Sequence, residues 1–117
     1  MASDDKFHYE VEHSEIPASE VLDTRGNQVT TIKCHGRLVS ETTSSLKDVV
    51  KPLIPLGGRI LVDLGDISQL DSSGLGMLVG LKASAINQGY CILEFANMTP
   101  RVLELVRITH LTKVFSA

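Results

Sequence analysis

The chain has few of the residues and runs that mark several large classes of protein. Only 4% of its residues are aromatic, tryptophan is absent, and its two cysteines, Cys34 and Cys91, have no CxxC spacing. Lysine and arginine together number 11 and form no basic run, so nucleic-acid binding has no electrostatic support. No apolar stretch approaches the ~20 residues of a membrane-spanning helix. We therefore expect no direct contact with nucleic acid and none with a membrane.

The opening residues also lack a secretion signal, because residues 1–5 are polar and acidic where a signal peptide would be basic and then apolar. Cys34 and Cys91 fall in expected strands, which favours buried free thiols of a reducing compartment. These features predict a cytoplasmic protein. Its 117 residues, 43% of them hydrophobic, suffice for one domain with a real core. We expect a single domain over 1–117, with an N-terminal strand and long connection in 1–28 and the core in 29–117.

Hydrophobic periodicity predicts strands that alternate with helices. Strands are expected at 7–11, 29–35, 59–64 and 90–95, and helices at 46–54, 72–88 and from Pro100 onward. Pro52 is expected to end or kink the first helix, and 111–115 to pack or to add a short strand. The continuous apolar run at 60–64 is typical of a strand buried on both faces. Residues 12–27 read as a long polar connection.

This alternation requires parallel crossovers, so the predicted fold class is α/β, a mixed and mostly parallel sheet of four to five strands with helices packed on it. Function in such sheets gathers at the carboxyl ends of the strands. Five polar residues are expected at that edge after the third strand: Asp63, Asp66, Asp71, Ser72 and Ser73.

The most informative segment, Asp-Ser-Ser-Gly-Leu-Gly at 71–76, lies where a strand gives way to a helix. Unpaired backbone N–H groups and the helix dipole favour negative charge there, so a phosphate on Ser72 or Ser73 would be stabilised. The plainer alternative is capping, because Asp and Ser are both favoured N-cap residues. Gly74 and Gly76 each cost about 1 kcal/mol of helix propensity relative to alanine, which suggests a need for close approach.

The helix at 72–88 is expected to present one broad apolar face, with small residues among its large ones. The large residues of that face are Leu75, Leu78, Val79 and Ile86. We expect the small residues Gly76, Gly80 and Ala83 to contact the sheet or a partner closely, so that Gly76→Leu damages folding or binding by overpacking.

Enzyme chemistry has little support in this sequence. Ser72 has Gly74 after it but Leu70 where a nucleophile elbow needs glycine. The histidines show no spacing that ties one to Ser72 as a base; they are His8, His13, His35 and His110. The interval from Leu64 to Gly74 is too long for a dinucleotide-binding turn, and there is neither a phosphate-loop lysine nor a metal-ligand cluster. We expect a non-enzymatic protein without cofactor or metal.

Several segments together resemble the STAS-domain family, above all its stand-alone bacterial anti-sigma-factor antagonists. They are Val62-Asp63-Leu64, the segment 70–76, Gly89, the segment 97–102 and Leu111 to Phe115. The resemblance implies that Ser72, the serine directly after the aspartate, is phosphorylated by an anti-sigma factor that is also a serine kinase. It further implies that the unphosphorylated form binds this partner and frees a sigma factor, and that a serine phosphatase restores it.

The surface that this resemblance implies for partner binding consists of Asp63, Asp71, Ser72, Ser73, Gly74, Leu75 and Gly76. Many family members carry acidic residues after the glycine of the second strand, where this chain has Arg37, Leu38 and Val39 after Gly36. That strand edge is expected to border the partner. A second class of function stays open: a constitutive scaffold or accessory subunit, in a stress-signalling assembly or a lipid-transport complex, in which Ser72 is only a cap.

Overall fold

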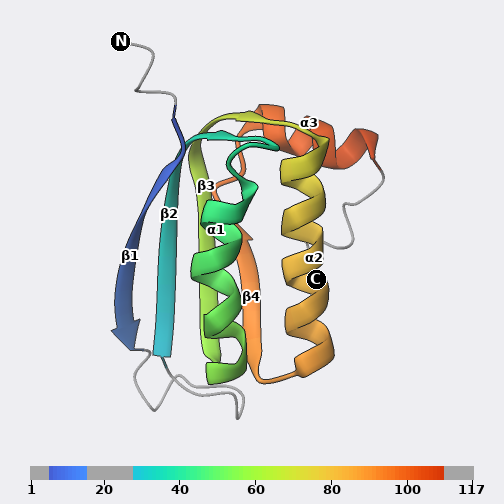
Figure 1. Ribbon diagram of the computed structural model, residues 1–117. Helices are drawn as coiled ribbons and strands as arrows, with labels where there is room; N and C mark the ends of the chain where they lie inside the picture. Colours follow the sequence, from blue (N-terminus) through green and yellow to red (C-terminus); the bar gives the residue numbers. More distant parts are fainter. Residues whose placement is uncertain (1–5, 16–27, 110–117) are drawn as a thin grey trace.

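The computed structural model describes residues 6–15 and 28–109 (Figure 1). Its elements in chain order are β1 (His8–Glu15), β2 (Gln28–Leu38), α1 (Thr43–Val50), the 3-10 helix η3 (Lys51–Leu56), β3 (Gly58–Leu70), α2 (Ser72–Gln88), β4 (Cys91–Ala96) and α3 (Pro100–Ile108). The four strands form one sheet in the order β1-β2-β3-β4. β1 is antiparallel to β2, and the other two pairs are parallel. The predicted fold class, a mixed and mostly parallel sheet with helices packed on it, is confirmed.

The helices cover one face of the sheet. Figure 1 shows α1 and α2 side by side over that face, with α3 across one end. Burial alternates along β3 as a result: Ile60 and Val62 face the helices and are at most 1% exposed, whereas Leu61 and Asp63 face the other side and are half-buried. The expectation that residues 60–64 form a strand buried on both faces is therefore wrong. A run of apolar residues does not by itself show that both faces are covered.

β3 is also longer than predicted, and its extension positions the start of α2. Its pairing with β4 ends at Asp63 and Ala96, while its pairing with β2 continues to Leu38 and Leu70. Register shifts accompany this continuation, and Figure 1 shows the two strands curving over the end of the helical layer toward α2. Asp63 and Asp66 thus lie within β3, so their expected position after the strand is corrected.

The predicted helix boundaries agree closely with the structure. α1 ends before Pro52 and gives way to η3. α2 stops at Gly89, which has the left-handed conformation (φ 74°) and donates its N–H to the carbonyl of Ala85. Thr99 caps α3 by accepting a hydrogen bond from the Val102 N–H at 3.2 Å, and Pro100 takes the first helical position. Residues 12–15 of the expected connection belong to β1 instead, and its residues 16–27 and the tail at 111–115 lie outside the described residues.

The buried face of α2 differs from the predicted one at its C-terminal half. Ile86 is 63% exposed, although its spacing placed it on the apolar face. Lys82 is buried instead, and its ammonium donates a hydrogen bond to the carbonyl of Leu93 in β4 at 2.6 Å. The aliphatic stem of a lysine can occupy an apolar position when the charged end finds an acceptor. Among the described helices, none combines the length and the apolar character needed to cross a membrane.

Candidate functional site at the start of α2

The cap of α2 is Asp71. Its backbone is extended (φ −104°), its Oδ1 accepts a hydrogen bond from the Gly74 N–H at 2.8 Å, and its carbonyl accepts the first helical hydrogen bond, from Leu75. Capping is thus supplied by the aspartate and does not require a serine hydroxyl. The cap that the sequence offered as the plainer alternative is therefore Asp71, and modification of Ser72 or Ser73 stays a prediction.

Asp71 also joins the start of α2 to the end of β2. Its Oδ2 accepts a hydrogen bond from the Ser40 N–H at 3.1 Å, and its own N–H donates to the Leu38 carbonyl at 3.4 Å. A β-carbon on Gly74 would lie 2.3 Å from that same carbonyl oxygen and 2.7 Å from Cδ1 of Leu70. Gly74 is therefore the residue at which α2 needs a glycine for close approach.

The other small residues of α2 do not play that part within the chain. A β-carbon on Gly76 or Gly80 would meet nothing within 4 Å, and Ala83 is exposed. The expectation that this small face contacts the sheet closely is wrong, and so is its consequence that Gly76→Leu overpacks the fold. Gly76, Gly80 and Ala83 do have helical spacing, but the helix face that they share points to solvent. Contact of this face with a partner stays a prediction.

Ser72 and Ser73 are the first two residues of α2, and both are exposed. Within the described part of the chain, neither hydroxyl has a hydrogen-bond partner. N–H groups in the first helical turn have no acceptor inside the helix, and no acidic side chain occupies that turn of α2. A negative group attached to either serine would meet backbone donors and the positive end of the helix dipole.

Charged side chains surround this helix start on its β2 side. The pKa of the Glu41 carboxyl is lowered, chiefly because the Ser40 hydroxyl donates a hydrogen bond to it at 2.6 Å. The positive charge of Arg37 also lowers that pKa, whereas the negative charge of Asp71 opposes the shift. The surface beside the start of α2 therefore already carries two carboxylates, Asp71 and Glu41, and one guanidinium, Arg37. A further negative charge on Ser72 would make this surface strongly acidic.

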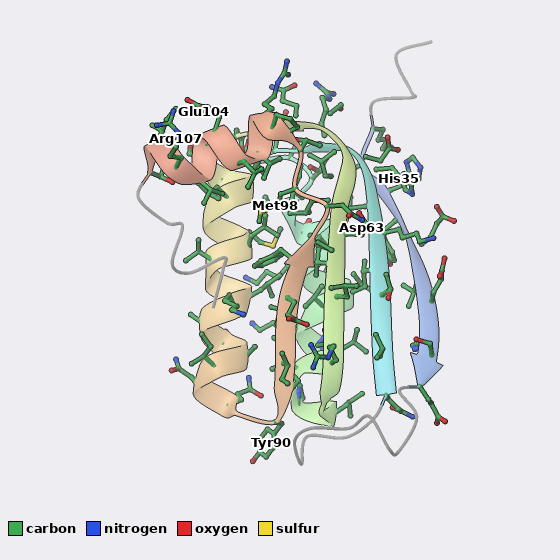
Figure 2. The ribbon with its side chains drawn as sticks, turned by 180° about the vertical axis from the view of Figure 1, so that it is seen from behind. His35, Asp63, Tyr90, Met98, Glu104 and Arg107 are labelled. Carbon is green, nitrogen blue, oxygen red and sulfur yellow. The ribbon has the colours of Figure 1, made fainter. Side chains whose placement is uncertain are left out.

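Of the predicted binding residues, Asp71, Ser72, Ser73 and Gly76 come together at the surface, while Gly74 and Leu75 are buried beneath them. Asp63 lies apart, on the uncovered face of the sheet (Figure 2). Its Oδ1 accepts a hydrogen bond from the Gly65 N–H at 2.9 Å, and its Oδ2 accepts one from the Asn97 side chain at 3.1 Å. Its carboxylate thus holds the turn that follows β4, and its membership of a partner surface with Ser72 stays a prediction.

Sequence reasoning missed a histidine cluster on the same uncovered face. Nδ1 of His35 lies 2.5 Å from Oδ2 of Asp66, and Nε2 lies 2.7 Å from Oε2 of Glu10. The ring also stacks on that of His8, with centroids 4.7 Å apart. The hydrogen bond to Asp66 is the largest cause that raises the pKa of His35; burial opposes it, and Glu10 adds to it. One ring thereby ties three strands together, β1, β2 and β3.

Both cysteines are buried, as predicted, and Cys34 is a free thiol. Burial raises the pKa of the Cys34 thiol to about 12. Across residues 6–15 and 28–109, no three histidine, cysteine, aspartate or glutamate side chains are grouped so as to hold a metal ion.

Comparison with known proteins identifies the family. The family model described as "Mlab, STAS domain" matches residues 21–116. An anti-sigma-B factor antagonist of Staphylococcus aureus is 36% identical over 81 residues, which are 68% of this chain and 74% of that protein. A STAS-domain containing protein of Pseudomonas aeruginosa is 30% identical over 98 residues, which are 84% of this chain and 96% of that protein.

Solved structures share the fold at lower identity. The anti-sigma factor antagonist SpoIIAA in its unphosphorylated form aligns with a TM-score of 0.64 at 18% identity, covering 91% of this chain and 84% of that one. An anti-sigma factor antagonist from Mycobacterium paratuberculosis aligns with a TM-score of 0.66 at 19% identity, covering 96% and 85%. The fold, the matched family model and the identity to curated relatives agree, and the chain belongs to the STAS-domain family.

Proposed function

We propose that this protein is a cytoplasmic anti-sigma-factor antagonist that works as a phosphorylation-controlled binding switch. The unphosphorylated form binds an anti-sigma factor that is also a serine kinase, and a sigma factor is thereby freed. Phosphorylation of Ser72 ends this binding, and a serine phosphatase restores it. The antagonists among its relatives support the role. The observation that supports the switch is that Asp71 caps α2, while the neighbouring hydroxyl of Ser72 is exposed and has no hydrogen-bond partner among the described residues.

The protein acts in this scheme as a substrate and a binding partner and supplies no catalytic group. The phosphoryl group passes from ATP held by the kinase to the Ser72 oxygen, the hydroxyl proton leaves to the kinase, and ADP is released. The new phosphate carries about −1.5 to −2 charges at neutral pH. Backbone N–H groups and the helix dipole compensate that charge locally by about 0.3–1 kcal/mol, so the fold tolerates it.

The surface that binds the partner does not tolerate the charge of the phosphate as the fold does. Asp71 precedes the phosphate directly, and Glu41 lies close enough to Asp71 for their charges to interact. A partner that fits the neutral serine beside these carboxylates would meet a dianion in its place. Unfavourable charge juxtaposition across an interface costs several kcal/mol, which suffices to end the binding.

A specific experiment tests the modified residue. Purified protein is incubated with its anti-sigma-factor kinase and ATP, and the gain of one phosphate is followed by intact mass. Ser72→Ala and Ser73→Ala form a matched pair, because both serines are exposed residues in the first turn of α2. The proposal expects Ser73→Ala to gain the phosphate and Ser72→Ala to remain unmodified; the reverse pattern contradicts it.

The alternative role is a constitutive scaffold or accessory subunit of the same fold. It is favoured by the description of the matched family model, which carries the name Mlab rather than that of an antagonist. In that role Ser72 stays unmodified, and a charge at this position leaves complex formation unchanged. Failure of every serine-kinase partner to modify wild-type protein, together with stable complex formation by Ser72→Asp, would select this alternative.

A further inference from the structure

A groove of about 310 Å³ lies between α1 and α2, away from Ser72. The residues that form it include Lys47 and Lys51 on one side, Gly80 and Ser84 on the other, and Met77 and Leu81. Gly80 follows Ser72 by eight residues, which at 1.5 Å per residue is about 12 Å along the helix axis. The groove opens to solvent, since Lys47, Lys51 and Gly80 are exposed. It is therefore a surface separate from the proposed phosphorylation site.

The rim of this groove is positively charged. Lys47 and Lys51 are one helical turn apart, because the N–H of Lys51 still donates to the Lys47 carbonyl. Neither lysine forms an ion pair within residues 6–15 and 28–109. Asp48 follows Lys47 and lies three residues before Lys51, a spacing that makes neighbours on a helix, but no ion pair with either lysine forms among the described residues. α2 contains no acidic residue on the opposite side.

The uncovered face of the sheet, in contrast, carries carboxylates that are paired with cations: Glu10 with His35, Glu12 with Lys33 and Glu94 with Arg59. The chain carries a net charge of −3, so the basic groove stands out against an acidic molecule. The two lysines of the groove form no such pair among the described residues, so they attract the carboxylates of an acidic partner.

The shape of the groove suits a helix. Its apolar part is formed by Leu81, which is 4% exposed, and by the half-buried Met77. At Gly80 a β-carbon would meet nothing within 4 Å, so an approaching backbone finds open space there. A groove between two helices, apolar inside and charged at one rim, matches the recognition mode in which a partner lays an amphipathic helix along it.

We propose that the α1–α2 groove is the docking site for an acidic amphipathic helix of a partner protein. Two carboxylates one turn apart on that helix pair with Lys47 and Lys51, and its apolar side covers Met77 and Gly80. The groove is independent of phosphorylation, so it serves recognition in either state of Ser72.

The test uses the full-length ¹⁵N-labelled protein and a short synthetic amphipathic helix that carries glutamates one turn apart. Its counterpart has those glutamates replaced by lysines. We expect the acidic peptide to shift the amide signals of Met77, Gly80, Leu81 and Ser84, and the basic counterpart to leave them in place. Shifts confined to the sheet, no shifts with either peptide, or equal shifts with both would overturn the proposal.

Charge variants sharpen this test. Lys47→Glu combined with Lys51→Glu is expected to weaken binding of the acidic peptide about tenfold, because reversal of both charges turns two attractions into repulsions. Lys6 is exposed and lies outside the groove, so Lys6→Glu changes the net charge as much as Lys47→Glu or Lys51→Glu alone and is the control for each. If Lys6→Glu weakens binding as much as Lys47→Glu does, the attraction is nonspecific and the docking site is refuted.

A shape variant and two other probes complete the design. Gly80→Leu fills the groove and is expected to abolish the peptide-induced shifts, while Asn87→Leu places the same apolar side chain at an exposed position outside the groove and is expected to preserve them. Inorganic phosphate and anionic phospholipid vesicles are titrated in parallel. If phosphate shifts the same signals as the acidic peptide, the groove binds a simple anion. If the vesicles do so, it binds a membrane surface. Either result overturns the proposal.

Discussion

The carbonyl oxygen of Leu38 lies 2.3 Å from the point that a β-carbon on Gly74 would occupy. The end of β2 is thus pressed against the first turn of α2. Together with the two hydrogen bonds that Asp71 makes to Leu38 and Ser40, this contact fixes the helix start on the sheet. The exposed hydroxyl of Ser72 is therefore held on a rigid support.

Gly74→Ala is expected to lower the free energy of unfolding by about 1–3 kcal/mol, because its β-carbon meets backbone that cannot move aside cheaply. Gly76→Ala and Gly80→Ala are the matched controls in the same helix. Each is expected to raise stability by about 0.5–1 kcal/mol, since alanine favours the helix and finds open space. Urea unfolding measures all three; equal effects at Gly74 and Gly76 would show that the close contact with Leu38 does not constrain the helix.

Asp71→Ala is expected to cost about 0.5–2 kcal/mol of stability, because the Gly74 and Ser40 N–H groups lose their acceptor. Ser72→Ala, in contrast, should leave the free energy of unfolding within about 0.5 kcal/mol of wild type, as is usual for an exposed residue without a structural role. Thermal or urea unfolding distinguishes them. A Ser72→Ala variant as unstable as Asp71→Ala would return the serine to the role of a cap.

Stability should depend on pH through His35. Its hydrogen bond to Asp66 raises the pKa of the folded-state imidazole above the ordinary value of about 6.5. A group with a raised folded pKa stabilises the fold fully below the unfolded pKa and loses that contribution as pH rises through the folded one. The stability difference between wild type and His35→Gln should thus be largest near pH 6 and shrink toward pH 9. A difference that is constant with pH would contradict the charged cluster.

Cys34 should resist thiol reagents in the native protein. It is 1% exposed, and burial raises its pKa to about 12, so almost no thiolate forms at pH 8. Reaction with a disulfide reagent is expected to be slow in buffer and fast in urea, and mass spectrometry locates the modified residue. Rapid native modification of Cys34 would mean that the core around β2 opens far more often than its packing indicates.

Local sequence signals predicted the local structure well. Thr99 followed by Pro100, and Gly89 after Gln88, set helix boundaries through hydrogen bonds between neighbours in the chain, which a sequence displays directly. The strand at 59–64 and the helix from Ser72 to Gln88 were likewise confirmed in type, because the first is a short apolar run directly after Gly57 and Gly58 and the second keeps helical spacing over 17 residues.

Features that depend on distant partners were not predictable in this way. The need for glycine at Gly74 comes from Leu38, and the His35 cluster joins residues 10, 35 and 66. Neither relation leaves a spacing in the sequence. Burial of Lys82 in place of Ile86 depends on an acceptor in β4, Leu93, which no helical pattern reveals.

The central claim, that phosphorylation of Ser72 switches partner binding, is tested most directly by one affinity measurement. The dissociation constant for the anti-sigma factor is measured before and after kinase treatment, with the site mapped by fragmentation mass spectrometry. We expect the phosphate on Ser72, a weakening of at least about tenfold, an unchanged melting temperature, and a Ser72→Ala variant that stays bound after the same treatment. A phosphate on Ser73, or a Ser72-phosphorylated protein that binds as tightly as the unmodified one, would contradict the account.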